Sequence, residues 1–80
     1  MGQQQIFELI KAERARQDEK HGEGNKGSSN FRYLTIATEE IGEVAKAILD
    51  GESTERIVEE LVQVAAVCVQ WIEKLKGGER

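Results

Sequence analysis

Residues 61–72, LVQVAAVCVQWI, are apolar at every position except Gln63 and Gln70. A surface helix shows a single apolar stripe, whereas a helix that is apolar nearly all round must be buried on most of its sides. The run is also too short to cross a bilayer, which requires about 20 apolar residues. It therefore predicts a helix that is buried on most of its sides.

Helical periodicity extends outward from this run and predicts three helices. They cover, approximately, residues 3–20, 31–50 and 53–76. Gly51 suits the left-handed conformation that commonly ends a helix, and Ser53 or Thr54 can cap the start of the next one. We expect an all-α fold with one domain over residues 1–80, a bundle of three main helices per chain.

The length of the chain suggests that the bundle is completed by a second copy. A single core in about 80 residues gives marginal stability, and two partner helices cannot easily cover a third that is apolar nearly all round. We therefore expect a homodimer or homotetramer. The alternative is that some of these alanines and valines remain exposed.

A polar segment, residues 21–30 with the sequence HGEGNKGSSN, separates the first two predicted helices. Glycine, serine and asparagine at this density predict a flexible loop. The loop is either a plain connector or a mobile lid over a functional site, because functional loops are often long and rich in glycine.

Charge and composition exclude several classes of partner. The net charge of −4 argues against binding to a nucleic acid polymer, which needs a basic surface. No signal peptide or membrane-spanning run is visible. The single cysteine, Cys68, has no partner for an intramolecular disulfide. We expect a cytoplasmic protein that does not bind membranes.

Two acidic clusters carry the chemistry. Glu40 and Glu43, with Glu39 beside them, stand three residues apart, and so do Glu60 and Gln63. Side chains at this spacing share a helix face, roughly 5–6 Å apart, where like charges repel. Mg²⁺ prefers carboxylate oxygens and would relieve the repulsion between two such faces. The simpler interpretation is a solvated acidic surface.

The ordered motifs resemble the MazG-like all-α nucleoside triphosphate pyrophosphohydrolases. That family shows ExxE, a spacer and ExxD, which correspond here to residues 40–43 and 60–63. Further agreement lies in residues 13–22, ERARQDEKHG, and 60–67, ELVQVAAV. The resemblance extends over about residues 6–75 and implies a helical oligomer in which carboxylates bind Mg²⁺ and products are a nucleoside monophosphate and pyrophosphate.

The resemblance assigns roles to individual residues. Glu40, Glu43 and Glu60 would bind Mg²⁺, or alternatively Mn²⁺, and Glu39 would be a supporting acid or water-orienting base. Position 63 departs from the motif, since Gln63 can offer an oxygen but neither a negative charge nor a base. The cations considered for the phosphates of the substrate are Arg16, Lys20 and Lys26.

The main hypothesis is thus a Mg²⁺-dependent hydrolase that converts NTP or dNTP and water to the monophosphate and pyrophosphate, in a house-cleaning role. The first alternative is a module of the same fold that binds a nucleotide or a protein and in which Gln63 weakens or abolishes catalysis. A second alternative is a purely structural helical oligomer. Phe31 and Tyr33 are the better candidates for stacking on a base.

Overall fold

The computed structural model describes residues 1–21 and 29–77, with side chains for 1–19 and 29–77. Within these residues there are three α-helices and no strand: α1 (Gln3–His21), α2 (Asn30–Leu49) and α3 (Thr54–Lys76). The predicted all-α fold is confirmed, and each helix begins and ends within one residue of its predicted bounds. The interior of the predicted loop, residues 22–28, lies outside the described residues.

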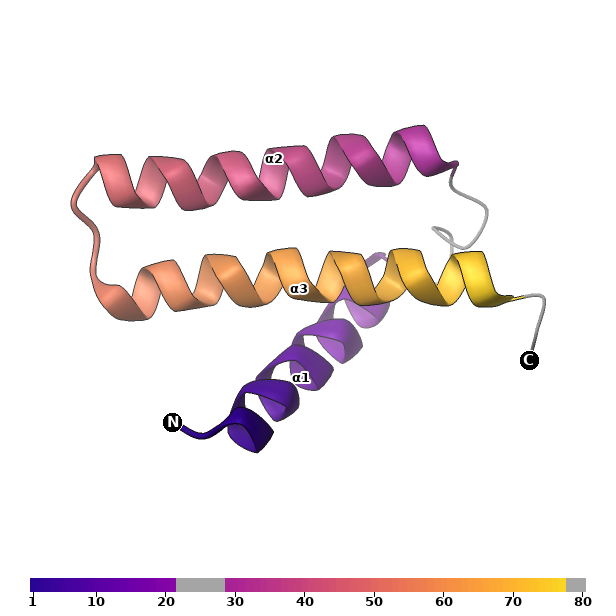
Figure 1. The fold of residues 1–80 in the computed structure, drawn as a ribbon, viewed down its shortest axis with the longest axis horizontal. Coiled ribbons are helices and arrows are strands. Elements are labelled where there is room, and N and C mark those ends of the chain that lie inside the picture. The colour runs from indigo at the N-terminus through magenta and orange to yellow at the C-terminus, as the bar shows by residue number, and fades with distance from the viewer. Residues whose placement is uncertain (22–28, 78–80) are drawn as a thin grey trace.

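Helices α2 and α3 form an antiparallel hairpin, and α1 crosses α3 at a steep angle (Figure 1). Helix α3 is the central element, because it packs against both of the others, whereas α1 and α2 contact each other weakly. This arrangement agrees with the apolar run at 61–72. Oligomerisation, which that run also predicts, stays a prediction.

The turn between α2 and α3 is set by Gly51 and by two hydrogen bonds that end α2. Gly51 has a φ of 68°, the left-handed conformation that glycine adopts without steric cost. The amide of Gly51 donates to the carbonyl of Ile48, and the amide of Glu52 donates to that of Ala47. This is a Schellman motif, which satisfies the last carbonyls of α2 and turns the chain toward α3.

Serine caps begin both helices of the hairpin. The Ser29 hydroxyl accepts a hydrogen bond from the Arg32 amide, and the Ser53 hydroxyl accepts one from the Arg56 amide, each at 3.2 Å. Such caps satisfy amides that have no partner inside the helix. Of the two caps predicted for α3, Ser53 is the one used.

The core is small and lies between α2 and α3. Its buried apolar side chains are Tyr33, Ala47, Ala66 and Val67. No described side chain of α1 (residues 3–19) is buried, and of its apolar side chains only Ile10 is half-buried, whereas Ile6, Phe7 and Leu9 are exposed. Helix α1 thus adds little to the core. Across the described residues, no helix has the length and apolarity needed to cross a membrane.

Candidate functional site

Glu60 on α3 is the only buried charged residue within the described part of the chain, with 3% of its surface exposed. Its Oε1 atom forms an ion pair with the guanidinium of Arg56, one helical turn earlier, at an Nη2–Oε1 distance of 2.8 Å. A buried charge is costly unless it is paired. Arg56 supplies that pairing, and its role was not predicted from the sequence.

Glu40 on α2 lies close enough to Glu60 for the two charges to interact. Its pKa is raised, first by burial and then by the negative charge of Glu60, with smaller contributions from Glu43, Glu13 and Glu39. The Oε2 atom of Glu40 is buried and has no hydrogen-bond partner among the described residues. A buried carboxylate oxygen without a hydrogen-bond partner is stabilised when it binds a proton or a cation.

Helix α1 contributes a pair of charges, Glu13 and Arg16, that interact electrostatically with Glu40. Both Glu13 oxygens accept from Arg16: Nε lies 2.9 Å from Oε1 and Nη2 lies 2.6 Å from Oε2. The pKa of Arg16 is raised, first by this hydrogen bond with Glu13 and also by the charge of Glu40. Arg16, a predicted phosphate-binding residue, is therefore within range of an electrostatic interaction with Glu40.

The other predicted site residues are less closely associated. Glu39 and Glu43 are exposed, and Gln63 is half-buried on α3. The side chain of Lys20 and all of Lys26 lie outside the described residues.

Of the two aromatic residues considered for base stacking, Tyr33 is unsuitable. It is 1% exposed and its ring stacks on Trp71, so it belongs to the core. Phe31 is 81% exposed and remains accessible.

The geometry bears on whether Mg²⁺ fits these residues. Among the side chains that the structure describes, no group of three or more acidic, histidine or cysteine residues is close enough to hold a metal ion. Mg²⁺, however, retains several waters and is commonly bound by one or two carboxylates together with substrate phosphates. Glu40, with its unpartnered Oε2, and the neighbouring Glu60 meet this smaller requirement.

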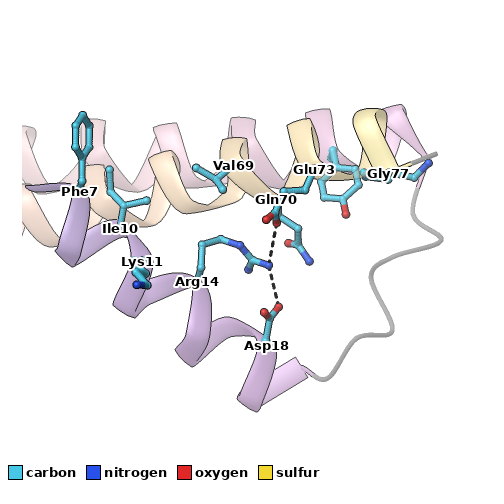
Figure 2. A pocket seen from close by; sticks show the side chains of 11 residues that line it. Phe7, Ile10, Lys11, Arg14, Asp18, Val69, Gln70, Glu73 and Gly77 are labelled. Atoms are coloured by element: carbon cyan, nitrogen blue, oxygen red, sulfur yellow. Dashed lines mark hydrogen bonds and ion pairs between the residues drawn. The ribbon is translucent and has the colours of Figure 1, made fainter. Parts of the chain in front are cut away.

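A groove of about 750 Å³ lies between α1 and α3. Figure 2 shows Arg14 reaching from α1 toward Asp18 and Glu73, with Nη2–oxygen distances of 3.0 and 3.6 Å. Phe7, Ile10 and Val69 contribute apolar surface to it. None of the predicted metal ligands lines this groove, so it is separate from the acidic pair.

Two residues of this region, Arg56 and Glu13, were given no individual role from the sequence, although the spacing between each and its partner indicates an ion pair. Arg56 precedes Glu60 by four residues, and Glu13 precedes Arg16 by three, which are the spacings of helical ion pairs. Such pairs are common on exposed helices, so the spacing alone did not mark these residues as part of a site.

Comparison with known proteins found no match to any protein family, curated protein or solved structure.

Proposed function

We propose that this protein is a Mg²⁺-dependent nucleoside triphosphate pyrophosphohydrolase, which releases pyrophosphate and a nucleoside monophosphate. The observation that carries the proposal is the acidic pair of α2 and α3: Glu40 has a buried oxygen without a partner, and Glu60 is a buried carboxylate close to it. The order of the acidic residues, which resembles that of MazG-like enzymes, supports the same function.

The proposed roles follow from position and charge. Glu40 and Glu60 hold the cation, with Glu43 and the oxygen of Gln63 at the exposed side. Bound Mg²⁺ supplies a positive charge that polarises phosphate oxygens and lowers the pKa of a bound water. Glu39 orients that water. Arg16, which Glu13 holds by two hydrogen bonds, binds phosphate oxygens beside Glu40.

The proposal includes a homo-oligomer, either dimer or tetramer, in the cytoplasm. Large apolar side chains remain exposed along α2 and α3, at 51% for Ile41, 57% for Ile48 and 60% for Ile72. Exposed apolar surface favours association, because burying it removes it from water. A second copy of the chain that covers it would also enlarge the small core.

The test is pyrophosphate release from a panel of nucleoside triphosphates, with and without MgCl₂. We expect release only with the metal, and a loss of about 100-fold or more in Glu43→Gln, with unchanged helix content. Glu8→Gln is the matched control, because Glu8 is an exposed glutamate of α1 that accepts a hydrogen bond from Gln4 on the same helix. Full activity in Glu43→Gln would contradict the proposed site.

The second candidate function is a binding module of the same fold. Gln63 favours it, because this amide occupies the position where the resembling enzymes carry an aspartate. Gln63→Asp separates the two candidates: a large gain in pyrophosphate release indicates a degenerate site, whereas little change indicates that Gln63 is adequate. Thermal stabilisation by Mg²⁺ or nucleotide without turnover would also favour the binding module.

A further inference from the structure

Arg56 and Glu60 form an ion pair between partners of unequal burial. Only 4% of the Glu60 side chain is exposed, whereas 46% of the Arg56 side chain is exposed. The carboxylate is fixed in the helical interface, while the guanidinium lies at the surface on a long, flexible stem. Of the two, Arg56 is therefore the group that can move away without opening the fold.

Arg56 also has other carboxylates within reach. Its Nη1 atom lies 3.4 Å from Oε1 of Glu59, and its Nε atom lies 4.0 Å from Oε1 of Glu52. The pKa of Arg56 is raised, first by the hydrogen bond with Glu59 and then by the charges of Glu60 and Glu52. A guanidinium that leaves Glu60 would still be paired at the surface, so the cost of its departure is small.

A divalent cation bound to Glu60 would conflict with the present position of Arg56. The guanidinium is 2.8 Å from the carboxylate oxygen that the cation needs. Two positive charges on one partly buried carboxylate repel strongly, because solvent screens them poorly there. Without the cation, the guanidinium offsets the negative charge that Glu60 places next to Glu40.

We propose that Arg56 is the built-in counter-ion of the acidic pair and competes with the divalent cation for Glu60, moving to Glu52 and Glu59 when the cation binds. The inference rests on the proposed function, since it concerns the same metal site. It makes Arg56 a residue that sets the cation concentration at which the site fills. Arg56 acts through Glu60 and has no contact with the reacting atoms.

The experiment is calorimetric titration of the full chain with MgCl₂ at constant ionic strength. Arg56→Gln should bind Mg²⁺ about fivefold more tightly than the wild type, the effect expected from losing one partly exposed ion pair. Arg32→Gln makes the same chemical change at an exposed arginine that has no ion pair within the described part of the chain. Its Mg²⁺ affinity should equal that of the wild type.

A double-mutant cycle separates direct competition from general charge effects. In a Glu60→Gln background, Arg56→Gln should no longer change the Mg²⁺ affinity, because the contested carboxylate is gone. Arg56→Lys keeps the positive charge and serves if Arg56→Gln fails to fold without metal. Its affinity should lie between those of the wild type and Arg56→Gln.

Melting temperatures give a readout that is independent of activity. Without Mg²⁺, Arg56→Gln should melt below the wild type, because Glu60 is left as an unpaired buried charge. Added Mg²⁺ should raise its melting temperature more than it raises that of the wild type. A variant that loses stability and regains none with Mg²⁺ would show that Arg56 is only a structural partner and would overturn the inference.

The two proposals fail in distinguishable ways. Equal Mg²⁺ affinity in the wild type, Arg56→Gln and Arg56→Lys would overturn the competition, whatever the enzymatic activity. Tighter binding in Arg56→Gln without pyrophosphate release from any nucleotide would overturn the enzyme and support the competition. If neither the wild type nor any variant binds Mg²⁺, both proposals are wrong.

Discussion

Two regions of the α2–α3 interface, an aromatic end and an acidic centre, differ in how their polar groups are satisfied. At the aromatic end, Tyr33 stacks on Trp71 with ring centroids 5.8 Å apart, and the Trp71 indole donates to Asn30 Oδ1 at 2.8 Å. At the acidic centre, Glu40 keeps a buried oxygen without a partner among the described residues, next to the charge of Glu60. The same two helices therefore contain a region whose polar groups are paired, and a frustrated region in which like charges lie close together and a buried oxygen has no partner.

The aromatic end and the acidic centre therefore contribute differently to the stability and to the chemistry of this small protein. Stacked rings and matched hydrogen bonds stabilise the fold. Like charges that are partly removed from water do the opposite, and they persist where the surrounding packing holds them in place. The frustrated region is accordingly the place to look for a ligand, and perturbed carboxyl pKa values cluster at functional sites.

The largest expected effect comes from breaking the aromatic end. Tyr33→Ala removes the largest fully buried side chain, and we expect a loss of about 3–5 kcal/mol in the free energy of unfolding. Urea denaturation followed by circular dichroism measures it. Tyr33→Phe keeps the ring and the stack, so it should retain most of the stability. If Tyr33→Ala is as stable as Tyr33→Phe, the stack does not hold the hairpin together.

The next effect has the opposite sign and lies at the acidic centre. Glu40→Gln removes the charge, and without metal at neutral pH we expect a gain on the order of 1 kcal/mol, allowing for solvent screening of this half-buried group. The melting temperature of the variant should exceed that of the wild type. Glu8→Gln, a matched change on exposed α1, should leave it unchanged. A loss of stability in Glu40→Gln would mean that the charge is already compensated.

The pH dependence sharpens this comparison. Burial and the neighbouring carboxylates raise the pKa of Glu40, so the folded state binds its proton more tightly than the unfolded state does. The stability that this proton contributes is complete below the unfolded pKa and is lost as the pH rises through the folded pKa. As the pH falls from neutrality, the wild type should therefore approach Glu40→Gln in melting temperature. A difference that is constant with pH would contradict the assignment.

The smallest effect tests the hydrogen bond of the aromatic end. Asn30→Ala removes the acceptor of the Trp71 indole, and we expect a loss of about 0.5–1 kcal/mol. Trp71 is the only tryptophan, so its fluorescence reports the change directly. Asn30→Asp retains an oxygen acceptor and should preserve the emission maximum. An unchanged spectrum in Asn30→Ala would show that the bond is not made in solution.

Much of the fold could be predicted from residues that act locally. Gly51 marks a turn by its backbone preference and Ser53 marks a cap by its side-chain hydroxyl, and the structure uses both. The helical spacing of α2 could be recognised because its apolar residues recur on one face, and the run at 61–72 predicted a helix that is buried on most of its sides. Helix α1 has no buried side chain among residues 3–19, so its sequence contained no pattern from which its crossing of α3 could be inferred.

The candidate site could be predicted only in its acidic residues. Spacing placed Glu40 with Glu43 and Glu60 with Gln63 on shared helix faces, because three residues are nearly one turn. It could not show that Glu60 is buried while Glu43 is exposed, since burial depends on which neighbours cover each face. For the same reason Tyr33, a candidate for base stacking by position, is a core residue.

The sequence by itself determined the three helices, their ends and the acidic motifs, because caps, glycine conformations and apolar periodicity depend on neighbours a few residues away. The tertiary structure was needed to show that Glu40 of α2 and Glu60 of α3 interact, that Glu60 in the Arg56–Glu60 pair is buried, and that the charges of Arg16 and Glu40 interact. Charges on different helices interact through space, and their distance and exposure are set by how the helices pack.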